Sequence, residues 1–279
     1  PPTPPRVGIR RQRQMCIRDS LSRPGSCRPG ILAPKHKLDN SQELPHQVMN
    51  NPANPIAERL AQVRQQIANC ASSCGRNAHD VTLIAVSKTK PVTDIITAYD
   101  AGQRAFGENY LQEAEAKITA LADHDIVWHF IGRIQSNKTA SIARNFDWVH
   151  TLSSLKHARR LDEQRPQSLP PLNVCIQLNL SGEASKSGIS AEELSALAAA
   201  VDNLSRLNLR GLMTMPPAAS SEQEQRALFS RLRHLMNDLQ QQGLALDTLS
   251  MGMSNDMQAA ICEGATMVRI GTAIFGARS

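Results

Sequence analysis

Lys88 is the residue whose type and position most clearly suggest chemistry. It follows the apolar, β-favouring run Val81–Ser87, and Pro91 then opens an expected helix. A run bounded in this way is typical of a buried parallel strand, and lysine is almost never fully buried without a partner. An amine shielded from water there has a lowered pKa and can form an imine with an aldehyde. A snorkelling or salt-bridged lysine would fit the same position, whereas Lys90 has the setting of a solvated loop residue.

A candidate phosphate site lies near the C-terminus. Residues 251–256 end a strand and open a helix, with a glycine and the hydroxyl of Ser254, and Gly271 and Thr272 follow the core of the last strand. Glycine lets the backbone approach a ligand closely, and unpaired amides at a helix start bind phosphate. Helix capping alone would explain Ser254. The coincidence of both segments after neighbouring strands favours phosphate.

Arg269 adds a cation to the same region. It lies in the apolar run 267–275 (MVRIGTAIF), where an unpaired charge would be costly. The arginine could pair with a carboxylate or hydrogen-bond to a ligand, and the sequence leaves both readings open. An imine-forming lysine, a phosphate cradle and a strand arginine together suggest pyridoxal 5'-phosphate. They would also suit a Schiff-base aldolase that acts on sugar phosphates.

Short apolar strands and amphipathic helices alternate along the chain and must position these residues. The expected strands are 81–87, 104–108, 125–131, 146–152, 173–180, 209–215, 248–253 and 267–275. The expected helices are 55–74, 91–100, 110–121, 136–145, 155–164, 190–204, 221–242 and 255–263. Ser190 and Glu193 predict a capping box at the start of the sixth of these helices.

This alternation predicts an α/β protein with a single (β/α)8 barrel of the TIM type. One helix precedes the first strand and none is expected after the eighth, so the N-terminal helix would complete the outer ring. A doubly wound open sheet is the alternative, but its Gly-rich dinucleotide turn is missing. The C-terminal strand ends of a barrel line its active site, and the candidates above fall at such ends.

Residues 1–50 differ in composition from the rest. The formal net charge of +6 comes entirely from this tail, which has nine Lys or Arg against three Asp or Glu. We expect 1–50 to be a disordered or artefactual basic tail, because it lacks apolar periodicity and its segment 13–20 resembles a translated sequencing adapter. Residues 51–279 form the expected barrel. Their balanced charge argues against a nucleic-acid partner, and no run of about 18 apolar residues could span a membrane.

The cysteines indicate neither a metal site nor a disulfide framework. Cys70 and Cys74 are one helical turn apart, but no second pair follows at zinc-site spacing, which favours helix packing. Unpaired thiols are typical of a reducing compartment, so we expect a cytoplasmic location.

Six motifs stand in order along the chain: AVSKTKP at 85–91, AFGENY at 105–110, WHFIG at 128–132, QSNK at 135–138, LSMGMS at 249–254 and VRIGTAIFG at 268–276. In wording and order they resemble the motifs of the pyridoxal-phosphate homeostasis protein family. The resemblance runs from about residue 54 to 278 and leaves residues 1–50 without a counterpart. Arg133 departs from the family pattern, in which a smaller or uncharged residue is expected.

This resemblance implies a fold-type III barrel like the N-terminal domain of alanine racemases, with pyridoxal phosphate held as an internal aldimine. Lys88 matches the aldimine lysine, and Arg269 matches the arginine that faces the pyridine nitrogen. The resemblance also puts His129 near the site, without a role. The other cofactor-binding residues that it implies are Asn109, Met213, Ser254, Gly271 and Thr272.

The residues favour a carrier over an enzyme. An arginine beside the ring nitrogen disfavours its protonation and weakens the cofactor as an electron sink. A racemase also needs an acid or base on each face of its substrate. Tyr99 lies in an expected helix, where packing explains it, and Tyr110 follows Asn109 but has no evident partner base. We therefore expect a non-catalytic protein that buffers or delivers pyridoxal phosphate and so maintains vitamin B6 and amino-acid homeostasis. Its expected partners are apo-enzymes that need pyridoxal phosphate, and we expect it to be a monomer. The alternative is a single-domain amino-acid racemase.

Overall fold

The computed structural model describes residues 55–181, 187–217 and 221–277. All of them belong to one compact unit, Met49–Ser279. The expected tail, residues 1–50, lies outside the described residues.

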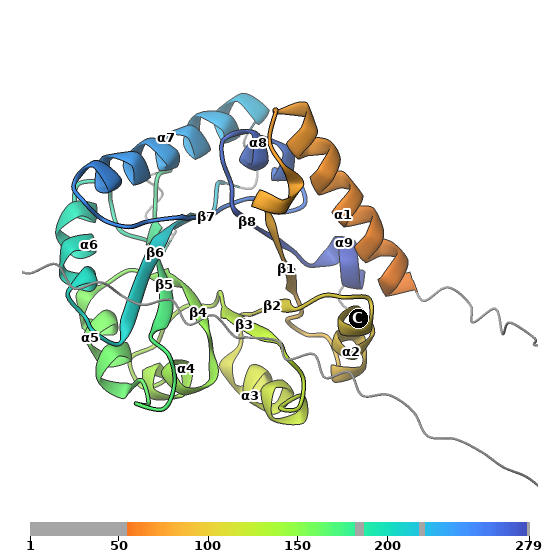
Figure 1. The fold of residues 1–279 in the computed structure, drawn as a ribbon, viewed down its shortest axis with the longest axis horizontal. Coiled ribbons are helices and arrows are strands. Elements are labelled where there is room, and N and C mark those ends of the chain that lie inside the picture. Colours follow the sequence, from red (N-terminus) through yellow and green to blue (C-terminus); the bar gives the residue numbers. More distant parts are fainter. Residues whose placement is uncertain (1–54, 182–186, 218–220, 278–279) are drawn as a thin grey trace, which may run out of the picture. The chain divides into compact units, whose positions relative to one another are not determined.

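The described chain forms a closed parallel barrel in which strands β1 to β8 pair in sequence order and β8 returns to β1 (Figure 1). The predicted (β/α)8 architecture is therefore confirmed, and the open doubly wound sheet is wrong. The strands are β1 Thr82–Val86, β2 Ala105–Glu108, β3 Val127–Phe130, β4 Trp148–Leu152, β5 Leu172–Leu178, β6 Leu207–Thr214, β7 Thr248–Ser250 and β8 Met267–Ile270.

Helices surround the strands, and α1 packs against α2, α8 and α9, where the first and last units of the barrel meet (Figure 1). The predicted closing role of the N-terminal helix is thus confirmed. The helices are α1 Pro55–Ser73, the 3-10 helix η1 Ala78–Asp80, α2 Val92–Asp100, α3 Leu111–Ala120, α4 Thr139–Asn145, α5 Leu155–Gln164, α6 Leu194–Asp202, α7 Glu222–Gln241, α8 Met257–Cys262 and α9 Thr272–Phe275.

Two expectations about element ends were wrong. The predicted eighth strand, 267–275, ends at Ile270, and Thr272–Phe275 forms the short helix α9 where no helix was expected. Apolar residues alone do not distinguish a strand from a helix turn, and Gly271 separates the two. The helix expected from Ser190 begins only at Leu194. The Ser190 N–H donates to the Glu193 carboxylate at 3.0 Å, so one half of the expected capping box forms ahead of the helix.

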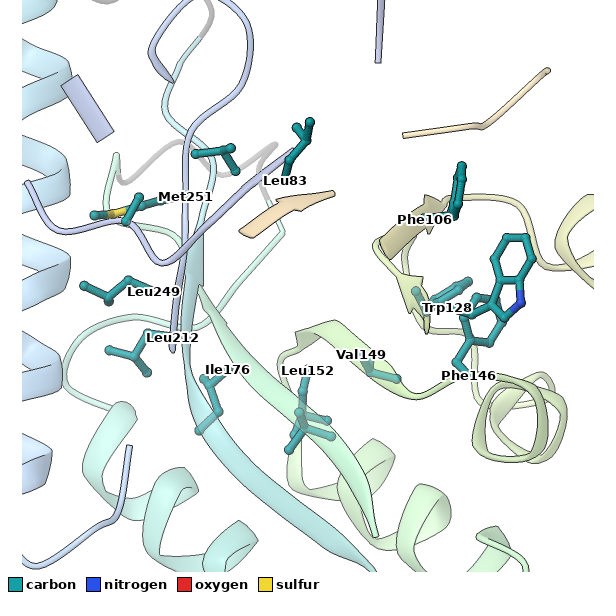
Figure 2. Packing of buried hydrophobic residues seen from close by; sticks show 14 of the residues in the cluster. Leu83, Phe106, Trp128, Phe146, Val149, Leu152, Ile176, Leu212, Leu249 and Met251 are labelled. Carbon is teal, nitrogen blue, oxygen red and sulfur yellow. The ribbon is translucent and has the colours of Figure 1, made fainter. Parts of the chain in front are cut away.

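The core has two layers because strand side chains alternate in direction. A large outer cluster joins the strands to the helices, and Figure 2 shows Ile176, Leu212 and Leu249 in it on successive strands. A smaller cluster lies within the barrel and consists of strand residues whose side chains point inward. Its members are Ile84, Ala105, Trp148, Cys175, Met213 and Met267. Arg269 lies two residues after Met267 and therefore shares its inward direction.

The cysteine expectations are corrected in part. Cys74 at the end of α1 forms a disulfide with Cys262 at the end of α8, across 188 residues of sequence. Their Cα atoms lie 5.2 Å apart, inside the range that a disulfide spans. Cys70 is a free thiol packed against the outer core, as predicted.

The part of the chain that the structure describes shows neither a membrane-spanning helix nor a metal-binding group of side chains. None of its helices is long and apolar enough to cross a membrane. None of its His, Cys, Asp and Glu side chains gather in a group of three or more that could hold a metal ion.

Candidate functional site

One cavity at the C-terminal ends of the strands collects every cofactor-binding residue that the sequence predicted. Its volume is about 230 Å³, just below the roughly 300 Å³ at which drug-sized ligand pockets begin, so it suits a small ligand. The predicted residues on its wall are Lys88, Asn109, Met213, Ser254, Arg269, Gly271 and Thr272. Their separate roles toward a ligand stay predictions.

Lys88 reaches the cavity from the turn that follows β1. The side chain is half-buried, and the next residue, Thr89, has a φ of +63°. Lys90 also lines the cavity, where its ammonium donates to the backbone carbonyl of Ala277 at 2.7 Å. The prediction that Lys90 is a solvated loop residue was therefore incomplete, because its ammonium connects the turn after β1 to Ala277.

Arg269 provides the cation of the cavity from β8. Only 4% of the residue is exposed, and its guanidinium donates to the Ser250 hydroxyl at 2.7 Å and to the Thr214 carbonyl at 3.1 Å. Burial lowers its pKa to about 10, partly offset by the Asp256 carboxylate, so the group stays cationic at neutral pH. Within the described residues no carboxylate forms a salt bridge with it, which rules out the direct-pairing reading.

A chain of buried hydrogen bonds extends from Arg269 into the barrel. The Ser250 hydroxyl is 2.8 Å from His150 Nδ1, and His150 Nε2 is 2.9 Å from His129 Nδ1. His129 was expected near the site without a role, and the structure places it three hydrogen bonds away from Arg269, stacked on Trp148. Ser250 and His150 were missed because both lie within strands, and the sequence does not show that their side chains meet inside the barrel.

Burial of His129 predicts a loss of stability in acid. Desolvation lowers its pKa from 6.5 to about 3, so below pH 6.5 the unfolded chain binds a proton that the folded chain refuses. His129 alone should lower stability by about 1.4 kcal/mol per pH unit as the pH drops from 6.5 toward 3, and the buried His150, whose pKa burial also lowers, adds to this slope. Urea unfolding at several pH values measures the slope.

His129→Gln removes one titrating group and should make that slope shallower by about 1.4 kcal/mol per pH unit. The same change at the exposed His79 provides the control. Equal slopes in wild type and His129→Gln would show that His129 is not the group responsible.

The part of the cavity wall at the end of β2, the neighbour of β1, depends on close backbone packing. A Cβ at Gly132 would lie 2.0 Å from the Asn109 carbonyl oxygen, so only glycine fits there. Asn109 follows β2, and its buried side-chain Oδ1 has no hydrogen-bond partner within the described residues. A buried polar atom without a partner is costly. Because Asn109 lines the cavity, a ligand with a hydroxyl or amide group could donate a hydrogen bond to this Oδ1.

The wall at the ends of β7 and β8 carries the predicted anion cradle. Gly252 has a φ of +100°, and an added Cβ would approach Ala260 Cβ to 2.7 Å. A Cβ at Gly271 would lie 3.1 Å from the Val86 carbonyl, so this backbone packs directly against the end of β1. Asp256 accepts the Met253 N–H at 2.5 Å and thereby fixes the loop that presents Ser254. The cavity thus combines an amine, a cation and a small-residue cradle, which fits a phosphorylated aldehyde.

Comparisons with known proteins agree with this geometry. The family model described as "Alanine racemase, N-terminal domain" matches residues 59–279. The pyridoxal phosphate homeostasis protein of Pseudomonas aeruginosa is 58% identical over 223 residues, 80% of this chain and 96% of that protein. The Escherichia coli K12 protein of the same name is 53% identical over 228 residues, 81% of this chain and 97% of that protein.

A solved structure shares the fold as well as the sequence. PipY of Synechococcus elongatus PCC7942, whose structure has pyridoxal phosphate bound, is 41% identical and superposes with a TM-score of 0.71. The match covers 79% of this chain and all of PipY.

Proposed function

Because the chain belongs to the pyridoxal phosphate homeostasis protein family, we propose that it binds pyridoxal 5'-phosphate and buffers or delivers it without catalysing a reaction. Two relatives more than half identical carry the homeostasis name, and PipY has been solved with pyridoxal phosphate bound. Protection of a reactive aldehyde, and its release to apo-enzymes, would support vitamin B6 and amino-acid homeostasis.

The observation that carries the proposal is the meeting of Lys88, Arg269 and Ser254 at one small cavity. Pyridoxal phosphate, when bound, would supply an aldehyde that can condense with an amine and release water. Lys88 provides that amine. Ser254, with the backbone of Gly271 and Thr272, would hold the phosphate, and Arg269 would face the ring nitrogen.

The non-catalytic part of the proposal rests on what else surrounds the cavity. The cationic Arg269 disfavours protonation of a ring nitrogen beside it. Tyr99 instead bonds to Asp125 and packs under Arg104. Tyr110 is 53% exposed and lines a separate pocket beside Arg133. Neither tyrosine lines the cavity, so neither supports the second acid or base that a racemase needs.

Borohydride trapping tests the binding proposal. Purified protein incubated with pyridoxal phosphate, reduced and digested should carry the phosphopyridoxyl mass on the peptide that contains Lys88. The unreduced sample should gain a visible absorption band. Labelling only of exposed lysines, in proportion to reagent concentration, would contradict the proposal.

Two further assays distinguish a carrier from a racemase. Loaded protein should reactivate an apo-enzyme that depends on pyridoxal phosphate, which tests delivery. Deuterium exchange at the α-carbon of amino acids should stay well below an enzyme turnover of about 1 s⁻¹. Exchange at that rate or faster would make the racemase the better reading. We also propose a monomer, which sedimentation would test. We propose a cytoplasmic location as well, although the Cys74–Cys262 disulfide removes the unpaired-thiol argument for it, and cell fractionation would test it.

A further inference from the structure

The turn that carries Lys88 is held in a strained conformation. Thr89 is the one non-glycine residue with positive φ in the described ranges, and it immediately follows Lys88. A left-handed conformation costs an L-residue energy, because its Cβ approaches the following carbonyl. Strain of this kind persists only where surrounding contacts enforce it, and it often marks functional sites.

Lys117 of α3 supplies one of those contacts from below the turn. Only 4% of this residue is exposed, and its ammonium donates to the Ser87 carbonyl at 2.7 Å, Glu108 Oε1 at 2.8 Å and Glu113 Oε1 at 2.5 Å. The three acceptors come from the β1 turn, the end of β2 and the first turn of α3. One ammonium thereby joins three segments directly beneath Lys88.

Glu113 and Glu108 hold the residues on either side of Lys88. Glu113 Oε1 accepts the Thr89 N–H at 2.6 Å, and Glu108 Oε1 accepts the Ser87 hydroxyl at 2.6 Å. The residue before the lysine and the residue after it are therefore each fixed by a carboxylate, and both carboxylates share the Lys117 ammonium.

Stability alone is a poor explanation for this cluster. Glu108 is fully buried, its Oε2 has no partner within the described residues, and desolvation raises its pKa although Lys117 opposes that shift. Removing charges from water often costs as much free energy as their attraction returns. A costly cluster that converges on one strained turn indicates that the position of the turn is what it secures.

We propose that Glu108, Glu113 and Lys117 form a clamp, called here the turn clamp, that holds residues 87–90 so that the Lys88 amine faces the cavity. These are positioning residues, because they act through the backbone of the turn. The inference rests on the proposed function, in which Lys88 is the residue that binds the aldehyde.

Glu113→Ala tests the turn clamp without emptying the core, since 29% of the Glu113 side chain is exposed. It removes the acceptor of the Thr89 N–H, and the Kd for pyridoxal phosphate, measured by absorbance titration, should rise about ten-fold. Glu113→Gln keeps an oxygen at that place and should stay within about two-fold of wild type. Glu115→Ala is the matched control, because Glu115 lies on the same helix but contacts Ser141.

Thr89→Gly provides an independent readout. Glycine adopts positive φ at little cost, so the turn should need its clamp less. In Glu113→Ala/Thr89→Gly, at least half of the logarithmic loss in affinity should be recovered. A role confined to stability would instead lower the melting temperature of cofactor-free Glu113→Ala and leave the Kd unchanged.

The outcomes distinguish a failure of the proposed function from a failure of the turn clamp. If wild type forms no adduct at Lys88, the proposed function fails, and the turn clamp loses its purpose. If wild type binds but Glu113→Ala matches it, or if Glu115→Ala weakens binding equally, only the turn clamp is overturned. A raised Kd in Glu113→Ala with recovery in the double variant supports it.

Discussion

Lys88→Ala is expected to abolish covalent attachment of pyridoxal phosphate and to raise its Kd by at least about 100-fold, equivalent to about 2.7 kcal/mol. Lys88 and Lys90 are the lysines on the cavity wall within the described chain. Lys88 lies two residues after the end of β1, nearer to the barrel strand than Lys90. Without Lys88 the visible band and the borohydride-stable mass should both disappear.

Weak, reversible binding should nevertheless survive in Lys88→Ala. Arg269 and the segments around Ser254 and Gly271 remain in place, and they contact the ring and the phosphate in the proposed arrangement. Equilibrium dialysis would detect this residual binding, and added phosphate should compete with it.

Lys90→Ala is the matched control, because it removes a second amine from the same wall and leaves Lys88 intact. It should keep the adduct at Lys88. If the adduct moves to Lys90 in Lys88→Ala with little loss of affinity, the assignment of the amine is wrong.

The sequence was sufficient to predict which residues meet at the cavity. Strands of a parallel barrel all end at one rim, so locating each strand end was enough to bring Lys88, Asn109, Ser254 and Gly271 together. Boundary errors of a few residues did not matter, because each candidate lies at the end of its strand. The resemblance then selected these residues from the other polar groups on the rim.

Contacts below the rim could not be predicted in this way. Ser250 and His150 lie within strands, and only the folded barrel shows that the Ser250 hydroxyl contacts both Arg269 and His150. The pair of Cys74 and Cys262 is separated by 188 residues, and nothing in the sequence links them. Lys117 reads as an ordinary helix residue until the structure places its ammonium under the Lys88 turn. Long-range pairing is set by packing, which single residues do not reveal.

Gly211→Ala is expected to destabilise the barrel by more than about 3 kcal/mol, beyond the usual 1–3 kcal/mol of core overpacking. Gly211 of β6 pairs with Thr248 of β7, and an added Cβ would lie 1.8 Å from the Thr248 carbonyl oxygen and 2.7 Å from its carbon. A flexible side chain could move aside, but a backbone carbonyl in the barrel cannot move without disturbing the β6–β7 pairing. Against a typical total stability of about 5–15 kcal/mol, the loss is severe.

Thermal unfolding of the cofactor-free variant measures this effect, with an expected fall in Tm of at least about 6 °C. Gly243→Ala separates steric clash from backbone strain, because Gly243 has a φ of +97° and nothing within 4 Å of its added Cβ. That control should cost only about 1–2 kcal/mol. Because Gly211 lacks positive φ, its larger loss must come from the contact with Thr248. A Gly211→Ala protein as stable as wild type would show that β6 and β7 do not approach this closely, and the cavity that Met213 and Arg269 line would then need another geometry.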